Sequence, residues 1–299
     1  RNIMNSFINK IVRKLGFQRK LGWIPDDIYL KCVYQDQTGE KLDLINPRSF
    51  NEKIQWLKLY NRQPQYTDMV DKYRVRNYVK QTIGEQYLVK LIGVWKDPND
   101  IDFSRLPDQF VLKCNHNSSV GLCICRNKAL LNINKTKKDL CDGLEQNFYL
   151  TGREWPYKMV HRLIICEEYL EDPQVGELRD YKFFNFNGVP KLFKIDFNRF
   201  SGHRANYYDL DGNILPFGES DYPPDYNRNL VIPDCISKMI DLSSKLSAGI
   251  PFVRTDFYCV EGKIYFGEMT FFPASGFGKF TSEELNQKLG SWINLPDKK

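Results

Sequence analysis

The stretch that decides the fold is residues 251–272, which reads PFVRTDFYCVEGKIYFGEMTFF. Two runs rich in apolar and aromatic residues lie on either side of Glu261-Gly262. A pair of this kind between two such runs is typical of a tight hairpin turn. We therefore expect two antiparallel strands that are joined at Glu261-Gly262.

This hairpin would bring charged side chains together. Residues two apart on a strand point to the same side, so Arg254 shares a face with Asp256, and Glu268 shares a face with Thr270. Hard oxygen ligands such as these carboxylates suit Mg²⁺, which keeps some waters and takes further ligands from nucleotide phosphates. We expect a magnesium site here, although ordinary cross-strand contacts explain either carboxylate taken alone.

A second signal for phosphate lies upstream. The apolar run Phe110-Val-Leu ends in Lys113, and the small and polar segment CNHNSSVG follows at 114–121. Backbone N–H groups of such a loop cradle phosphate oxygens, and a lysine at its mouth adds a point charge. A Walker loop is absent from the sequence, and a solvated hairpin is the simpler interpretation of this segment in isolation.

Taken together and in this order, these segments resemble the ATP-grasp superfamily, in particular D-alanine–D-alanine ligase-like enzymes, over about two thirds of the chain. Met69-Val70-Asp71-Lys72 resembles the family's Asp-Lys pair at a helix start, and Ile165–Leu170 resembles its adenine-holding hinge. The resemblance implies bound ATP and Mg²⁺. The nucleotide-binding residues that it implies are Lys72, Lys113, Ser118, Ser119, Gly121, Glu167, Glu168, Tyr169, Leu170, Asp180 and Lys182.

The resemblance also implies a metal site and catalytic residues. Asp256, Glu268 and Thr270 would hold the metal, although Thr270 departs from the family's usual asparagine. Arg254 would face the phosphates. The segment KIDFNRFSGHR at 194–204 supplies Lys194 and Arg199, which would contact the γ-phosphate or an acidic acceptor unless they lie on a solvated face. His116 and His203 remain open as contacts or as ordinary polar residues.

More narrowly, the whole chain is similar to the TupA-like ATP-grasp branch, which is associated with the synthesis of cell-surface polysaccharide. The segments that carry this similarity are Phe50-Asn51-Glu52-Lys53-Ile54, Lys113-Cys-Asn-His116, Asp180-Tyr-Lys182-Phe and Gly267-Glu268-Met-Thr270-Phe. The similarity implies an ATP- and Mg²⁺-dependent ligase that joins a carboxylate to an amine through an acyl phosphate. It would attach an amino acid or amine to a sugar acid of a capsule, O-antigen or teichuronopeptide-like polymer.

Other functions stay open at this point. The same ATP site would serve a glycan kinase, and Asp209-Leu-Asp211 has the D-x-D form of metal-dependent glycosyltransferases. Because Gly212-Asn213 follows, a hairpin turn explains that D-x-D more simply. A non-catalytic glycan-binding module is a further possible function. The set of lysines, arginine and carboxylates argues against it.

The composition excludes several classes of partner and site. The chain is 42% apolar and 27% charged, with a net charge of +6, which suits a globular protein that binds anionic ligands. No dense basic block or RNP1 pattern points to nucleic acid. The eight scattered cysteines predict buried thiols rather than disulfides or zinc. We expect a small-molecule or glycan acceptor, and a lipid-linked or nucleotide-linked sugar is one candidate for it.

The first 20 residues predict a basic amphipathic helix. Apolar residues recur at helical spacing from Ile3 to Leu15, and Lys10, Arg13 and Lys14 lie among them. Such a helix lies on an anionic membrane or packs on its own domain through the same stripe. No apolar run reaches membrane-spanning length and no signal peptide is evident, so we expect a cytoplasmic protein, at the inner membrane face if this helix binds lipid.

The pattern of elements predicts an α+β protein with an ATP-grasp fold: two α+β lobes with nucleotide between them, and a helical N-terminal extension. The expected domains are residues 1–65, 66–170 and 171–299. A capping box at Ser49 opens one helix, and a second begins near Thr67. The remaining expectations are loops at 21–48 and 215–234, strands at 88–95, 109–114, 120–125 and 163–168, helices at 136–149, 234–248 and from Thr281, and turns at Asn187-Gly188 and Asp211-Gly212.

Overall fold

A computed structural model describes residues 2–173, 178–198, 201–228 and 230–298. The helices in these ranges are α1 (Asn2–Phe17), α2 (Asp26–Thr38), α3 (Phe50–Tyr60), α4 (Gln65–Val70), α5 (Val75–Thr82), α6 (Ile133–Glu145), α7 (Tyr149–Gly152), α8 (Ile236–Ser247) and α9 (Glu283–Ser291). The strands are β1 (Leu91–Trp95), β2 (Phe110–Cys114), β3 (Cys123–Cys125), β4 (Ile164–Glu168), β5 (Asp180–Phe186), β6 (Val189–Phe197), β7 (Arg204–Tyr208), β8 (Phe252–Val260) and β9 (Lys263–Thr270).

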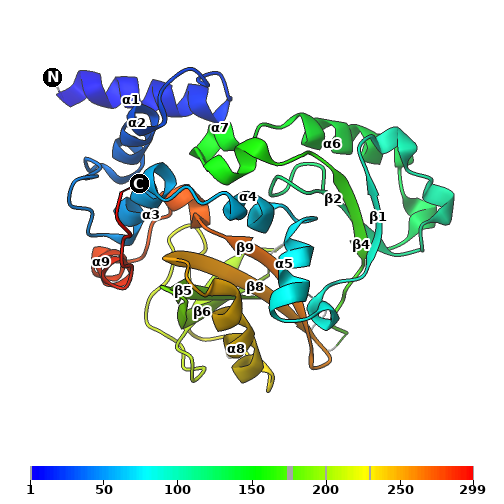
Figure 1. Ribbon diagram of the computed structural model, residues 1–299. Helices are drawn as coiled ribbons and strands as arrows, with labels where there is room; N and C mark the ends of the chain where they lie inside the picture. Colours follow the sequence, from blue (N-terminus) through cyan, green and yellow to red (C-terminus); the bar gives the residue numbers. More distant parts are fainter. Residues whose placement is uncertain (1, 174–177, 199–200, 229, 299) are drawn as a thin grey trace.

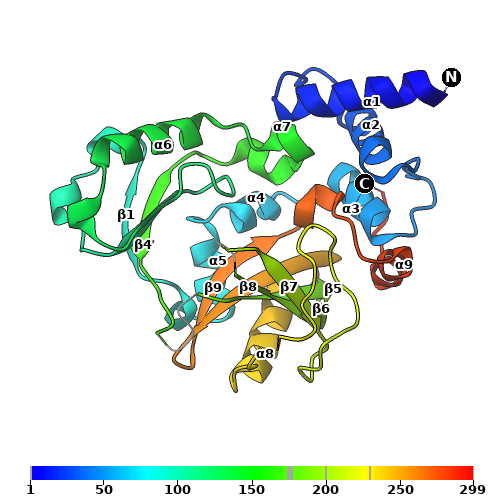
Figure 2. The same ribbon diagram turned by 180° about the vertical axis from the view of Figure 1, so that it is seen from behind.

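Within the described residues, the strands form two antiparallel sheets, so the chain has the expected α+β class. The first sheet has the order β1-β4-β2-β3, and the second has the order β7-β6-β5-β8-β9. Figures 1 and 2 show the two sheets as separate layers, with α6 on the first and α8 on the side of the second that faces away from the first. The two sheets therefore present their remaining faces toward one another.

Alternation of side chains explains which face of each sheet is covered. On β2, Phe110 and Leu112 are fully buried in a core that includes Leu140 of α6, whereas Val111 and Lys113 on the opposite face are half-buried. In the second sheet, aromatic side chains such as Phe183 belong to a core with residues of α8. The polar side chains of both sheets are thus left on the faces that meet.

The hairpin of β8 and β9 is confirmed. Glu261 and Gly262 form the turn with φ angles of 49° and 80°. The pairing places Asp256 opposite Glu268 and Arg254 opposite Thr270. The register shifts just after Asp256, because Phe257 pairs with Phe266, and this bulge was not apparent from the sequence.

Two predictions for the N-terminal third were wrong in detail. Residues 21–48, expected to be loop, contain α2, because Pro25 occupies its N-cap position and Gly39 its left-handed C-cap. The helix predicted from Thr67 is two helices, α4 and α5, separated at Asp71–Arg74. The Asp71 carboxylate accepts hydrogen bonds from the backbone N–H groups of Tyr73 (2.8 Å) and Arg74 (3.2 Å), which ends one helix and starts the next.

Other local predictions are confirmed. Ser49 and Glu52 form the capping box of α3, with each side chain accepting from the other residue's backbone N–H. Asn187 and Gly188 turn between β5 and β6 with φ angles of 51° and 80°. The Asp209 carboxylate accepts from the backbone of Asp211 and Asn213, so the D-x-D segment is a turn.

The predicted domain boundaries stay predictions. The boundary at 170/171 falls between β4 of the first sheet and β5 of the second. Residues of α3, α4 and α5 contribute to the core of the second sheet, so segments on both sides of the boundary at 65/66 share that core. Among the described residues, none of the helices has the length and apolarity that crossing a membrane requires.

Candidate active site

A cavity of about 310 Å³ lies between the two sheets. Its walls come from β2, β3 and β4 on one side and from β5, β8 and β9 on the other. The predicted site residues that line it are Lys72, Lys113, Ser118, Glu167, Glu168, Tyr169, Leu170, Asp180, Lys182 and Glu268. Residues far apart in the sequence are therefore brought to one place, as the predicted nucleotide site requires.

Lys72 reaches the cavity from the break between α4 and α5. Its backbone N–H donates to the carbonyl of Asn115 (3.1 Å), and its ammonium group donates to the carbonyl of Asn117 (2.6 Å). Asn115 in turn donates to the Asp71 carboxylate (2.8 Å). Burial lowers the pKa of Lys72, partly offset by the nearby Glu268 carboxylate. The helix break and the polar loop after β2 thus form one connected unit.

Lys113 points into the cavity from β2. Its ammonium group lies 2.5 Å from one carboxylate oxygen of Glu167, and Arg76 of α5 lies 3.0 Å from the other. The Glu167 side chain is therefore neutralised by two cations from different elements. An anion that enters the cavity would compete with Glu167 for Lys113.

The first sheet also supplies an apolar surface to the cavity. Val89, Val111, Leu122 and Ile124 line it on the side of residues 167–170. An apolar slot beside residues 167–170 suits a flat heterocycle, which is held by packing on its faces and by polar groups at its edge. This half of the cavity therefore differs in chemistry from the charged half.

The loop that follows β2 is only partly directed into the cavity. Ser118 and Ser119 are both exposed, but only Ser118 lines the cavity. Gly121 is buried with φ of 77°, and a Cβ there would lie 2.9 Å from Sγ of Cys114. Gly121 therefore has a packing role against the first sheet in addition to any role toward phosphate.

His116, in the same loop, is buried. Its Nε2 is 3.0 Å from the Gln146 carbonyl, and burial lowers its pKa to about 4.

The two carboxylates of the β8–β9 hairpin share one arginine. Nε and Nη2 of Arg254 donate to the two oxygens of Asp256 at 2.7 Å each. Nη2 also donates to Glu268 (2.9 Å) and to the hydroxyl of Thr270 (3.1 Å). All four predicted residues of this hairpin therefore meet, as the strand pairing requires.

The electrostatic environment shifts the pKa values of the two carboxylates in opposite directions. Burial raises the pKa of Asp256 to about 6, against the opposing effect of Arg254. Glu268 is also affected by burial, but the charges of Arg254, Lys72 and Lys182 outweigh it and lower its pKa to about 2. The Asp256 side chain is 1% exposed and that of Glu268 is 41% exposed. Glu268 is the carboxylate that faces the cavity.

These donors fit a hard divalent cation that is completed by other ligands. Asp256 and Glu268 lie directly opposite one another on paired strands, and the hydroxyl of Thr270 is 3.2 Å from Glu268. Among the described residues, no group of three or more histidine, cysteine or acidic side chains is arranged to hold a metal. The described side chains alone would not fill a coordination shell, which is the usual situation for Mg²⁺ bound with phosphates and water.

The polar face of the second sheet extends beyond the carboxylates. Lys182 of β5 forms an ion pair with the buried Asp196 of β6. Lys194 is on β6, which β5 separates from the β8 strand of Arg254, and its ammonium group lies 2.9 Å from Glu219 and 3.7 Å from Asp196. Nε2 of His203 is 3.4 Å from Asp196. This extension holds Lys194 firmly, whereas Arg199 lies outside the described residues.

Sequence reasoning missed several members of the site. Asn115, Arg76 and Glu219 each hold a predicted residue in place. Asn115 lies in the segment 114–121 but was assigned no role of its own, and neither Arg76 nor Glu219 lies in a motif with a recognisable spacing. Asn115 follows a strand that ends in a lysine, which is the one local signal that was available for it. Glu219 lies in the irregular segment after β7, 25 residues from Lys194, where no local pattern points to it.

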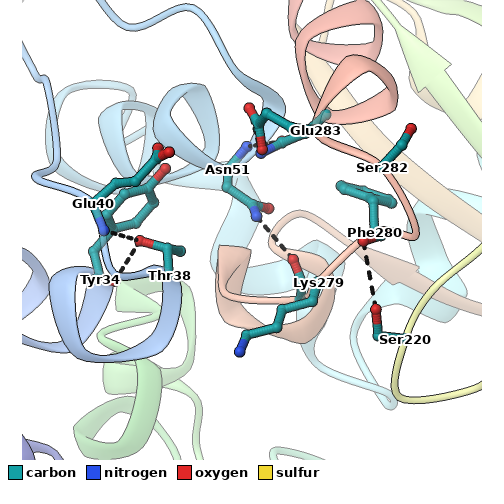
Figure 3. A pocket seen from close by; sticks show the side chains of 11 residues that line it. Tyr34, Thr38, Glu40, Asn51, Ser220, Lys279, Phe280, Ser282 and Glu283 are labelled. Carbon is teal, nitrogen blue, oxygen red and sulfur yellow. Dashed lines mark hydrogen bonds between the residues drawn. The ribbon is translucent and has the colours of Figure 1, made fainter.

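A second cavity, of about 240 Å³, lies between α2, α3 and the start of α9. Figure 3 shows its polar lining, in which Thr38 donates to the backbone of Tyr34 and Asn51 donates to the loop before α9. None of the predicted site residues lines it. Because its side chains bond mainly to one another and to the backbone, we assign it no ligand. All eight cysteines lie in the described part of the chain and are free thiols. Cys114, Cys125, Cys166 and Cys259 are buried, whereas Cys141 on α6 is exposed, so the prediction of a buried thiol was wrong for Cys141.

Comparison with known proteins adds a family and several similar folds. A sequence model of the family described as TupA-like ATPgrasp matches residues 52–294. No match is found among curated proteins.

Solved structures that resemble this chain include three ligases. D-Alanine–D-alanine ligase from Helicobacter pylori is 13% identical with a TM-score of 0.44, and the match covers 83% of this chain and 70% of that one. The Bacillus anthracis enzyme complexed with ATP is 13% identical (TM-score 0.42, 75% and 63% covered). Phosphoribosylamine–glycine ligase from Thermotoga maritima is 14% identical (TM-score 0.40, 69% and 48% covered). The chain spans less than two thirds of the latter two proteins.

Proposed function

Because the chain belongs to the TupA-like ATP-grasp family and has that fold, we propose that it is an ATP- and Mg²⁺-dependent ligase joining a carboxylate to an amine. The observation that carries this proposal is the single cavity into which both sheets direct their charged residues. Lys72 and Lys113 enter it from one side, and Lys182 and Glu268 enter it from the other. Cations that flank a carboxylate pair form the environment that a metal–nucleotide complex needs.

The two halves of the cavity suit the two ends of ATP. The apolar half, next to Glu167–Leu170, would take the adenine ring, with Asp180 beside the ribose. The charged half would take the phosphates, with Lys72, Lys113 and Lys182 as their counter-charges and Ser118 in the covering loop. Lys113 would exchange part of its ion pair with Glu167 for a phosphate oxygen, while Arg76 keeps Glu167 neutralised.

Asp256, Glu268 and the hydroxyl of Thr270 would hold Mg²⁺. When bound there, the ion would neutralise negative charge on the phosphate oxygens. Arg254 now binds both carboxylates, so it would release part of these contacts and turn its remaining donors toward phosphate. The family's asparagine is replaced by Thr270, whose smaller hydroxyl leaves more of the coordination to water.

The proposed reaction has two steps. A carboxylate oxygen of the acceptor bonds to the γ-phosphorus of ATP, the bond from that phosphorus to the β–γ bridging oxygen breaks, and ADP leaves. An amine nitrogen then bonds to the carbonyl carbon of the acyl phosphate, inorganic phosphate leaves, and the nitrogen loses a proton to solvent. The protein would act by positioning and by electrostatic stabilisation, with Arg254 facing the charge that develops in both steps.

The acceptor would bind over the extended polar face of the second sheet. Lys194, together with Arg199 from the undescribed part of the segment, would attract an acidic acceptor, and the His203 ring lies 4.1 Å from the exposed ring of Tyr222. Aromatic rings beside charged and hydroxyl groups suit a sugar. This combination, with the family's association, supports a sugar acid of a cell-surface polysaccharide as the carboxylate and an amino acid or amine as its partner.

The proposal is tested by identifying products. The protein is incubated with Mg-ATP, a panel of uronic acids and a panel of amino acids, and products are identified by mass. A product whose mass is the sum of both substrates less one water, with ADP and phosphate formed in equal amounts, supports the ligase. A gain of one phosphate indicates a kinase instead, and transfer from a nucleotide sugar without use of ATP indicates a glycosyltransferase.

A further inference from the structure

Helix α1 packs on the protein through one of its faces. Asn9 is buried and donates to the side-chain oxygen of Gln35 (3.0 Å), and Arg13 forms an ion pair with Asp36 of α2 at 2.5 Å. Val12 packs with the core residues of α2 and Gly16 lies against the ring of Tyr29. The position of α1 on α2 is therefore fixed by contacts of its own.

A different face of α1 carries apolar side chains into solvent. Phe7 is 64% exposed, Ile8 is 48% exposed and Ile11 is 41% exposed. Their spacing of i, i+1 and i+4 places them side by side in one stripe. We call these three residues the α1 stripe. The two interpretations of this helix from the sequence assumed a single apolar face, whereas the structure separates the packed face from the stripe.

Cations border the α1 stripe. Lys10 and Lys14 lie on α1 next to it and are both exposed. Trp23, shortly after the helix, is 79% exposed. Exposed apolar side chains that are bordered by lysines and followed by a tryptophan match the surface of a helix that lies at a membrane–water boundary.

We propose that α1 is a membrane-docking element that inserts the α1 stripe among the acyl chains of an anionic bilayer while its other face stays on α2. Lys10 and Lys14 would meet the lipid headgroups, where basic residues are attracted to the negative surface potential. A second protein chain is the other candidate for covering the α1 stripe. We favour the anionic membrane because Lys10 and Lys14 border the stripe. Figures 1 and 2 show α1 outside both sheets, and none of its described residues lines the cavity between them. This proposal does not depend on the reaction that the cavity carries out.

The test is sedimentation of the full chain with vesicles. One set of vesicles is pure phosphatidylcholine, and the other contains phosphatidylglycerol as an anionic component. The expected result is binding to the anionic vesicles that weakens as salt is raised. The triple variant Phe7→Ser, Ile8→Ser, Ile11→Ser is expected to bind at least about tenfold more weakly, which corresponds to about 1.4 kcal/mol.

A matched control replaces three exposed apolar side chains that lie elsewhere on the protein. Ile45, Leu130 and Val231 are 85%, 82% and 78% exposed, and all three lie outside α1. The variant Ile45→Ser, Leu130→Ser, Val231→Ser should bind vesicles like the unchanged protein. Lys10→Glu with Lys14→Glu should lose the preference for anionic vesicles, and it serves as the test if the triple stripe variant does not fold by circular dichroism.

Two results would overturn the proposal. One is equal vesicle binding by the unchanged protein and by the stripe or charge variants. The other is a dimer, measured by light scattering, that the stripe variant abolishes while neither protein sediments with vesicles, which would assign the α1 stripe to a second copy of the chain.

Discussion

The guanidinium group of Arg254 binds the carboxylate of Asp256 through two hydrogen bonds of 2.7 Å each, and both side chains are almost fully buried. The two residues are neighbours on one face of β8, two positions apart. The same arginine reaches across to Glu268 on β9 at 2.9 Å. Arg254 is therefore the counter-ion of the carboxylates that we propose for Mg²⁺, and the site is held together before the ion and nucleotide bind.

The two carboxylates should respond differently to neutralisation. Glu268→Gln should lower the rate by about 10²–10³, with a change in unfolding free energy of less than about 1 kcal/mol because the side chain is half-exposed. Asp256→Asn should lower the rate similarly but raise the unfolding free energy at pH 7, because burial makes the ionised carboxylate unfavourable in the folded protein. The rate is measured by product formation and the unfolding free energy by urea denaturation, for each variant. Near-normal activity of either variant would place the metal elsewhere.

The raised pKa of Asp256 predicts a pH dependence for cation binding. Its pKa is about 6 in the folded protein, above the ordinary value, so in the absence of ligand this group favours folding at low pH and loses that contribution as pH rises through 6. The proposed cation needs the ionised form. The rise in melting temperature with Mg-ATP should therefore grow between pH 5 and pH 7. The Asp256→Asn variant is the control, because protonation of the nucleotide affects it and the unchanged protein equally. Its melting-temperature shift with Mg-ATP should depend less steeply on pH than that of the unchanged protein. Equal pH dependence of the two proteins would contradict the assignment of Asp256 as a metal ligand.

The lysines of the cavity should decide nucleotide affinity. Lys72→Met and Lys113→Met should each weaken binding of Mg-ATP by about tenfold or more, since each removes a charged hydrogen-bond donor worth about 1.5–3 kcal/mol. Lys138→Met on α6 is the matched control, because Lys138 is exposed and does not line the cavity. Thermal shift against nucleotide concentration measures all three. If the control weakened binding as much as the cavity variants, net charge rather than position would be responsible.

The capping box of α3 should contribute to stability without affecting activity. Ser49 accepts a hydrogen bond from the Glu52 backbone at 3.2 Å, and Glu52 accepts one from Ser49 at 3.0 Å. Ser49→Ala should cost about 1 kcal/mol of unfolding free energy. Ser237→Ala, at an exposed serine of α8, should cost almost nothing. Urea denaturation with parallel rate measurements checks this, and an unchanged unfolding free energy for Ser49→Ala would be the contrary result.

The features that the sequence predicted are local ones. The β8–β9 hairpin followed from Glu261-Gly262 between two strand-like runs, and the capping box of α3 followed from its spacing. Helix α2 was missed because Pro25 and Gly39 have the same sequence appearance in a cap as in a loop. The break at Asp71 was missed because it depends on a side chain that accepts from its own backbone.

The site itself was predictable only in part. Lys72, Lys113 and Glu268 were expected to act on one ligand, and they do line one cavity. The contacts that hold them were not expected, because partners such as Asn117 for Lys72 and Glu167 for Lys113 are distant in sequence. Side-chain pairing of this kind is set by how the two sheets pack, which no short motif records.

The most direct test of the central claim follows oxygen from the acceptor into phosphate. The protein is supplied with Mg-ATP, amines, and uronic acids whose carboxylates are labelled with ¹⁸O. A ligase that works through an acyl phosphate transfers one ¹⁸O atom to each inorganic phosphate that it releases, and mass spectrometry of the phosphate should show that label. Phosphate that is released in step with product but without ¹⁸O would contradict the proposed reaction.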